Sequence, residues 1–413
     1  MRIAKTASLT QYQTTDFIMA ILSVNAGSST LKFALYPVDQ GAVQPSVLVG
    51  SYEGLEPNGA PMLKYGYEGE IRSVPLDCLS REPFACALSQ LKNLVLTLPN
   101  IPKIQAIAHR IVHGGSLFTQ SVISTTSILK ELSKLNVLAP LHQPHNIEGV
   151  RAFANAFPDI PQVLCFDTAY HKTVSSIESA FALPAEITSQ GVRRYGFHGL
   201  SYQYIIGTLL DCTKRAQGRV MMAHLGNGAS LCAAIGGKSI ATTMGFSALD
   251  GLMMGTRAGS LDAGVLLYLL DKGLTPEQLE KLLYKKSGLL GVSGISADMR
   301  KLRASKEPLA IVAIDLFTHR VVREAGAMVA CLEGLDVIAF SGGIGEHDSR
   351  LRQSVCEKLS WLGIKLDETL NQAATNDAIS KISAEDSAIE VWVIPTDEGL
   401  VAARDAQALL AQR

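Results

Sequence analysis

An arginine within an apolar segment is the first residue of this sequence with a chemical signature. Arg110 lies in a run that alternates like a β-strand, and a guanidinium in such a strand needs an anionic partner. Asp167 directly follows another predicted strand, the usual position of an active carboxylate in an open α/β sheet, although Asp also caps helices. His109 and His113 flank the arginine, and without a nearby third ligand they favour structural roles over a zinc site.

Three glycine turns could bind phosphate. Asn25 begins the turn N-A-G-S-S between two predicted strands, and Gly226-Asn227-Gly228 forms a similar turn later in the chain. Either turn could also be an ordinary hairpin connection. The third turn, S-G-G-I-G-E from Ser341 to Glu346, follows a strand and precedes a helix. In that arrangement backbone N–H groups and the helix dipole can bind a phosphate.

Two further segments carry cations, and one carries carboxylates. His198 lies in R-R-Y-G-F-H-G, a mixture that suits either anion binding or a solvated basic loop. Arg257 ends the glycine-rich, nearly uncharged segment 244–257, which is typical of a substrate-facing wall. Glu398, in P-T-D-E-G, precedes the last predicted helix, where it could interact with the helix dipole or hold Mg²⁺.

Short apolar runs alternate with helical patterns along the whole chain, which predicts an α/β protein. The predicted strands are 20–24, 31–37, 106–112, 162–166, 219–225, 231–235, 336–340 and 389–394, and the predicted helices include 83–98, 128–135, 144–157, 202–212 and 309–332. A strand–turn–strand pattern near residue 20 recurs near residue 220, and an offset of 200 aligns Thr30 with Ser230 and Leu31 with Leu231. The recurrence predicts two similar domains with a cleft between them.

The composition excludes several classes of protein. Of the 413 residues, 47% are hydrophobic and 18% are charged, which excludes a disordered or fibrous chain. The 37 basic and 38 acidic residues give a net charge of −1, which argues against nucleic acid or an anionic membrane surface as a partner. The seven scattered cysteines favour buried thiols in a reducing cytoplasm over disulfides or zinc ligands.

The N-terminal segment has some features of a secretory signal. However, Asp16 directly precedes its apolar stretch, which begins at Phe17 and continues into an alternating strand. We therefore expect residues 1–18 to form a loose extension ahead of the first core strand.

Ten segments between residues 25 and 400 resemble motifs of one family and occur in its order: NAGSSTLKF, HRIVHGG, LAPLHQPHN, FDTAYH, RRYGFHG, HLGNGAS, MGFSALDGLMMGTR, SADMR, SGGIGE and PTDEGL. Together they resemble the acetate kinase family, within the actin, sugar-kinase and Hsp70 nucleotide-binding superfamily. The resemblance implies two ribonuclease-H-like (actin-like ATPase) domains, the first formed by 19–166 plus 396–413 and the second, nucleotide-binding, by 167–395. It also implies a cytoplasmic homodimer that uses ATP, acetate, and Mg²⁺ or Mn²⁺.

The resemblance implies a role for each matching residue. Arg110, Asp167, His198 and Arg257 would be catalytic, and Asn25 and Glu398 would serve the metal. The nucleotide would contact Lys32, His224, Leu225, Gly226, Asn227, Gly228, Asp298, Met299, Arg300, Gly343, Ile344, Gly345, Glu346 and His347. The acyl pocket would be lined by Val112, Leu141, Phe197 and Ala248.

The sequence departs from the family pattern at several positions. His347 replaces the usual Asn, Ala248 the usual Pro and Gly399 the usual second Glu, and the segment 258–263 also differs. These departures fall on one expected adenosine contact and on the expected wall of the acyl pocket.

The chemistry of a carboxylate acceptor fits these residues. Its pKa near 4 leaves it ionised at neutral pH, so it needs no general base, and the main obstacle is the approach of two anions. Two alternatives stay open. In a sugar or polyol kinase Asp167 would act as base towards a hydroxyl, although two arginines would then have no carboxylate to bind. A nucleotide-binding scaffold without turnover is the third possibility.

Overall fold

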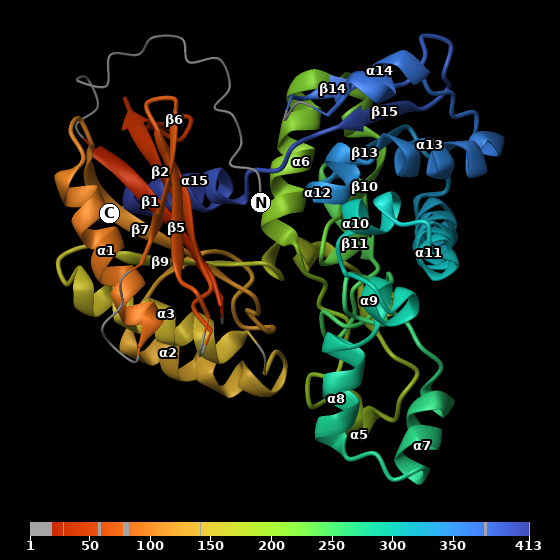
Figure 1. The fold of residues 1–413 in the computed structure, drawn as a ribbon, viewed down its shortest axis with the longest axis horizontal. Coiled ribbons are helices and arrows are strands. Elements are labelled where there is room, and N and C mark those ends of the chain that lie inside the picture. The colour runs from red at the N-terminus through yellow and green to blue at the C-terminus, as the bar shows by residue number, and fades with distance from the viewer. Residues whose placement is uncertain are drawn as a thin grey trace. The chain divides into compact units, whose positions relative to one another are not determined.

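The computed structural model describes residues 19–27, 29–56, 59–76, 82–140, 142–375 and 378–412. The chain divides into two compact units (Figure 1). The first contains the described residues through Ala169 together with those from Asp397 onward, and the second is Tyr170–Thr396. The expected extension 1–18 and the pocket residue Leu141 lie outside the described residues.

The first unit is built on one mixed sheet in the order β6-β5-β4-β2-β1-β7-β9-β8, with β3 paired to β2. Its strands are β1 (Met19–Ala26), β2 (Leu31–Asp39), β3 (Ala42–Val43), β4 (Leu48–Glu53), β5 (Met62–Tyr67), β6 (Glu70–Pro75), β7 (Lys103–Ile111), β8 (Val122–Ile123) and β9 (Gln162–Phe166). Its helices are α1 (Pro83–Thr97), α2 (Thr126–Ser133), η1 (Lys134–Val137), α3 (Gln143–Ala156) and α15 (Glu398–Leu410).

Helices cover both faces of this sheet. Leu164 and Phe166 of β9 pack on one face with residues of α2 and α3. Because side chains alternate along a strand, Cys165 points to the other face, where its Sγ lies 3.8 Å from the Ala402 carbonyl oxygen of α15. Helix α15, the blue helix behind the strands in Figure 1, therefore packs against β1 and β7 from the side opposite α3.

The second unit has a smaller mixed sheet in the order β12-β11-β10-β13-β15-β14. Its strands are β10 (Arg219–Leu225), β11 (Ala229–Ile235), β12 (Lys238–Thr242), β13 (Val337–Ser341), β14 (Ser380–Lys381) and β15 (Glu390–Val393). Helix α6 (Gly199–Cys212) packs on one face, where alternate residues of β10, β11 and β13 join its core. The long helix α11 (Pro308–Leu332) packs against β10, β11 and β12.

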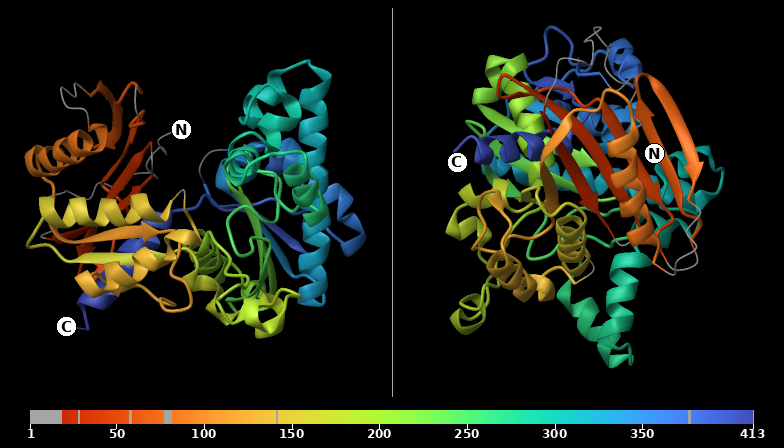
Figure 2. Two further views of the ribbon diagram at one scale, coloured as in Figure 1. Left: turned by 90° about the horizontal axis from the view of Figure 1, so that it is seen from below. Right: turned by 90° about the vertical axis from the view of Figure 1, so that its left-hand side faces the viewer.

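The other helices of this unit connect or extend this core (Figure 2). They are η2 (Ala169–Thr173), which begins at the last residue of the first unit, α4 (Ser176–Ser179), α5 (Ala185–Thr188), η3 (Lys214–Gln217), α7 (Ala263–Asp271), α8 (Pro276–Lys285), α9 (Gly288–Ser293), α10 (Met299–Ala304), α12 (Gly342–His347), α13 (Ser349–Lys358), η4 (Ser360–Leu362) and α14 (Glu368–Ala373). Helix α8 begins with a complete capping box between Thr275 and Gln278.

The two sheets share a five-strand core with one topology. In the first unit β4, β2 and β1 are antiparallel neighbours, and β7 and β9 continue the sheet parallel to β1. In the second unit β12, β11 and β10 are antiparallel neighbours, and β13 and β15 continue parallel to β10. The predicted α/β class is confirmed, and the recurrence between residues 20 and 220 corresponds to the first hairpin of each core.

The described cysteines are not all free thiols. Cys86 is disulfide-bonded, which corrects the expectation that the cysteines form no cross-link; Cys165, Cys212, Cys232, Cys331 and Cys356 are free thiols. Among the described residues, no helix is long and apolar enough to cross a membrane.

Candidate functional site

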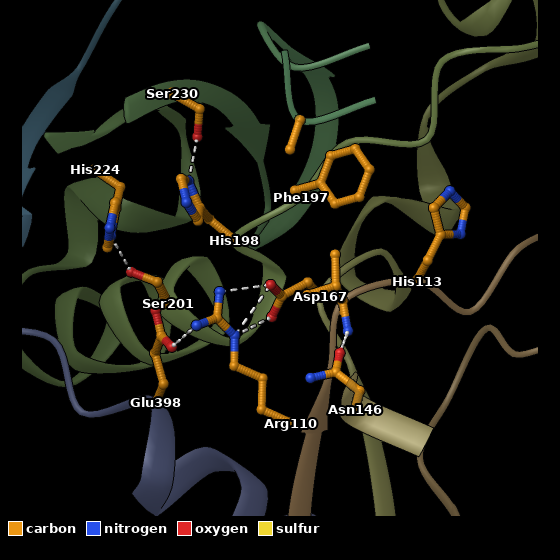
Figure 3. Close-up of polar contacts among 12 residues, drawn as sticks. Arg110, His113, Asn146, Asp167, Phe197, His198, Ser201, His224, Ser230 and Glu398 are labelled. Carbon is orange, nitrogen blue, oxygen red and sulfur yellow. Dashed lines mark hydrogen bonds and ion pairs between the residues drawn. The ribbon is translucent and has the colours of Figure 1, made fainter. Parts of the chain in front are cut away.

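Two carboxylates of the first unit contact the guanidinium of Arg110 (Figure 3). The Arg110 Nε lies 3.0 Å from Asp167 Oδ1, and its Nη2 lies 2.7 Å from Asp167 Oδ2. On the other side, Arg110 Nη1 lies 3.3 Å from Glu398 Oε2. One guanidinium thus binds both carboxylates, which is the anionic partnership expected for a charge within a strand.

The sheet brings these residues together because β7 and β9 are parallel neighbours. Arg110 is opposite Cys165 in the register, so the two strands end at the same edge. The Asp167 amide donates to the Ile111 carbonyl at 3.0 Å and thereby extends the pairing by one residue. Glu398 reaches the same edge as the first residue of α15, whose first turn is capped by Asp397.

Burial sets the electrostatics of this cluster. Burial raises the pKa of Asp167, and the Arg110 guanidinium opposes that shift by favouring the carboxylate. Burial also lowers the pKa of Arg110, but Asp167 and Glu398 more than reverse it, so the pKa lies above its usual value. Arg110 is therefore a permanent cation.

Two buried amides of α3, to which the sequence analysis assigned no role, hold the loop after Arg110. Asn146 Oδ1 accepts from the Val112 amide at 3.0 Å, and its Nδ2 donates to the Ala26 carbonyl at 2.8 Å. Gln143 bonds both the amide and the carbonyl of His113. The available sequence signal was a pair of amides on the buried side of an amphipathic helix.

Of the residues expected at the metal and the nucleotide, Asn25 and Lys32 lie opposite each other on the neighbouring strands β1 and β2 of this unit.

In the second unit, two histidines lie together between α6 and β10. The rings of His198 and His224 are 4.3 Å apart between centroids. His198 Nδ1 lies 2.9 Å from Ser230 Oγ, and His224 Nδ1 lies 2.8 Å from Ser201 Oγ (Figure 3). Each serine contacts Nδ1 of its histidine. Nε2 of His198 lies on the side of Gly228, where an added Cβ would be 3.3 Å from it.

The glycine turns of this unit come together at the ends of β10 and β13. A Cβ at Gly342, whose φ is +73°, would lie 2.8 Å from the Leu225 carbonyl oxygen, so only glycine fits this approach. Glu346 Oε1 accepts from the Gly342 amide at 2.8 Å and from the Thr396 amide at 3.2 Å. The turn 226–228 is partly exposed beside this loop, as a phosphate-binding turn must be.

The residues expected on the adenosine side are joined to this loop. Asp298 caps α10 and pairs with the exposed Arg300 at 2.6 Å. Arg303, also on α10, pairs with Asp348, which follows α12 and its residues Gly343, Ile344, Gly345 and His347. Leu225 and Met299 are buried, so their side chains belong to the core.

Arg352, missed by the sequence analysis, fixes the end of this loop. Its fully buried guanidinium donates to the Gly345 and Glu346 carbonyls at 2.9 and 2.8 Å and also contacts Asn371. Burial lowers its pKa to about 10. An arginine among backbone carbonyls has no distinctive sequence pattern.

The Arg257 side chain is held by an earlier residue of its own segment, 244–257. Its Nη1 donates to the Ala248 carbonyl at 2.9 Å, and the guanidinium lies 5.9 Å from the centre of the Tyr284 ring. Of the other residues expected to line an acyl pocket, Phe197 is buried in the same unit, and Val112 belongs to the first unit.

Comparison with known proteins places this architecture in a family. Residues 20–404 match the family model described as the acetokinase family. The chain belongs to the acetokinase family. It is 48% identical over 391 residues to the acetate kinase of Rhodopseudomonas palustris strain CGA009, covering 93% of this chain and 96% of that protein. Its fold is similar to a propionate kinase from Francisella tularensis (TM-score 0.86, 35% identity, covering 94% of this chain and 98% of that one) and to the acetate kinase of Porphyromonas gingivalis (TM-score 0.84, 34% identity, 95% and 100%).

Acetokinase family membership implies ATP and a divalent metal as cofactors, and the residues present are suited to that metal. Among the described residues no three metal-binding side chains gather into one cluster. Mg²⁺ in kinases typically uses one or two carboxylates together with substrate phosphates, and Asp167 and Glu398 supply such a pair beside Arg110.

A buried histidine supports the backbone at Phe197, one of the residues expected to line an acyl pocket. His171 Nε2 lies 2.9 Å from the Phe197 carbonyl oxygen, and Nδ1 lies 2.8 Å from Ser239 Oγ. Because a carbonyl only accepts, Nε2 carries the proton and Nδ1 accepts from the serine. Burial lowers the pKa of His171 to about 4.

We expect this histidine to make stability dependent on pH. Its folded pKa lies below the unfolded value near 6.5, so the unfolded chain takes up the proton first as the pH falls, and stability declines below pH 6.5. Between pH 7 and pH 5 the loss from His171 should be about 2 kcal/mol. Urea unfolding at both pH values should show a decline smaller by this amount in His171→Gln, and an equal decline in both proteins would contradict the assignment.

Proposed function

We propose that this protein is an acetate kinase that transfers the γ-phosphoryl group of ATP to acetate and forms acetyl phosphate and ADP reversibly. The observation that carries the choice of acceptor is the pairing of Asp167. Both of its oxygens accept from Arg110, so this carboxylate is committed to a cation instead of being poised as a base for an alcohol. A carboxylate acceptor, already ionised, needs no such base.

The proposed reaction is an in-line displacement. An acetate oxygen forms a bond to the γ-phosphorus while the bond from phosphorus to the ADP oxygen breaks, and the electron pair leaves with ADP. Arg110 and Arg257 would neutralise the approaching anions, and His198 would donate a hydrogen bond from Nε2 to the transferred group. A bound Mg²⁺ supplies charge neutralisation at the phosphates, and Glu398, Asp167 and Asn25 are the residues that would serve it.

We assign the nucleotide to the second unit. The turn 226–228 and Gly343, near the start of α12, are at least partly exposed and carry backbone amides. Helix α10, which Asp298 caps and which carries Arg300, is joined to the end of α12 by the ion pair between Arg303 and Asp348. The domain assignment predicted from the sequence, with two actin-like ATPase domains, agrees with this proposal. Mg²⁺ is the proposed metal, with Mn²⁺ as a substitute.

We also propose a homodimer and a cytoplasmic location. Helix α7 supports the dimer, because its residues Leu267, Tyr268 and Leu270 are 64%, 58% and 42% exposed and together form an apolar surface of the kind that a protein partner covers. The helix lies at the lower end of the second unit in Figure 1, beside α8.

The decisive assay traps acyl phosphate with hydroxylamine. We expect the hydroxamate to form from ATP with acetate and none to form with ATP alone. ADP release stimulated by glycerol without hydroxamate would favour a sugar or polyol kinase, and the absence of turnover with either acceptor would favour a scaffold.

Removal of either arginine should abolish most activity, but the two substitutions should affect thermal stability differently. Loss of one charge partner of a transition state typically costs about 3–4 kcal/mol, or several hundred-fold in kcat. Arg257→Ala should leave the thermal midpoint nearly unchanged because Arg257 is partly exposed. Arg110→Ala should lower it as well, because Asp167 is left buried without its cation. Near-wild-type kcat at saturating acetate in either variant would remove that arginine from the mechanism.

Ala248 should permit a longer acyl chain than proline at this position would. A proline adds ring atoms to the wall but keeps the carbonyl that binds Arg257. One methylene is worth about 1–3 kcal/mol of discrimination in an apolar pocket, so we expect appreciable use of propionate and a shift towards acetate in Ala248→Pro. The ratio of kcat/KM for the two acids decides the matter, and an unchanged ratio would show that Ala248 does not line the pocket.

A further inference from the structure

A tyrosine of β2 is bonded to the N-terminus of α15, next to the carboxylate of Glu398. The Tyr36 hydroxyl donates to Asp397 Oδ1 at 2.6 Å. The same oxygen accepts from the Leu400 amide at 3.0 Å, which caps the helix. Tyr36 thus fixes the capping side chain that defines where α15 begins.

Tyr36 also determines which residue can occupy position 399. A Cβ on Gly399 would lie 2.4 Å from the Tyr36 hydroxyl oxygen and 3.2 Å from two ring carbons. Tyr36 is 2% exposed, so its ring cannot swing away. Gly399 does not have a positive φ, so the glycine is required by the neighbouring phenol and not by the backbone.

We propose that Tyr36 is a positioning residue for Glu398, and that Gly399 is the residue its phenol requires. The phenol holds Asp397, the cap holds the first turn of α15, and that turn directs Glu398 to within 3.3 Å of Arg110. Where the family pattern has a second acidic side chain at position 399, this chain has a buried hydroxyl beside the helix end. The inference rests on the proposed function because it takes Glu398 to serve the divalent cation of a bound nucleotide.

The packing is tested by thermal unfolding of four variants. Gly399→Ala should lower the midpoint in the wild-type background, because the new methyl group meets the hydroxyl. In the Tyr36→Phe background the 2.4 Å contact is gone and only the two contacts of 3.2 Å with ring carbons remain, so the same substitution should lower the midpoint much less. Gly326→Ala on α11, where a Cβ would meet nothing within 4 Å, is the matched control and should raise the midpoint in both backgrounds. An equal effect of Gly399→Ala in both backgrounds would overturn the requirement for glycine.

The positioning role is tested by the Mg²⁺ dependence of ATP binding, measured by calorimetry. Tyr36→Phe should raise the Mg²⁺ concentration for half-saturation about two- to tenfold, the range expected for loss of one hydrogen bond, and should leave the KM for acetate unchanged. If Tyr36 acts through Glu398, it should cause no further shift in Glu398→Ala. An unchanged half-saturation in Tyr36→Phe, or an equal shift in both backgrounds, would overturn the proposal. The calorimetric readout does not use acetate, so failure of the proposed reaction would be recognised separately by the hydroxylamine assay.

Discussion

The positive charge of Arg110 constrains where the strands and the last helix of the first unit can end. It carries one positive charge between two carboxylates, so the cluster retains an excess of one negative charge at the edge of the sheet. Removing this cation from water is tolerable only because its hydrogen bonds are made, and that requires β7, β9 and α15 to end at one place. The excess negative charge is what a divalent cation with its phosphates would complete.

The second unit uses the same strand topology with a different chemistry. At the end of β7 the first unit places Arg110, whereas the second unit places Gly342 just after β13, the corresponding strand. At this strand end the first unit thus has a charged side chain, whereas the second unit has a buried glycine whose amide donates to Glu346. Buried polar side chains in both, such as Asn146 and Arg352, hold the loops in place by bonding backbone groups.

The sequence was sufficient wherever the signal was local. The apolar strands that run parallel to one another in the two five-strand cores were predicted within a few residues, because hydrophobic periodicity is a property of short segments. The strands β4, β5 and β6 were missed, and the outermost of them, β6, is exposed throughout, so it has no buried side to produce an apolar pattern. Arg110 and Asp167 were recognised by residue type and position, but their bidentate pairing was not, because it depends on the register of two strands more than fifty residues apart. The departure at Gly399 also had no explanation in the sequence, because the residue that requires glycine is Tyr36.

The position of α15 in the chain has a consequence for biosynthesis. This helix covers one face of the first sheet and carries Glu398, yet all of the second unit is synthesised between β9 and α15. On the ribosome the second unit, which is continuous in sequence, can complete its core while the face formed by β1 and β7 is still uncovered. Because domains fold as units during synthesis and exposed apolar strands promote aggregation, the unit that begins to be translated first is the last to be completed, and one face of its sheet stays uncovered until α15 has been made.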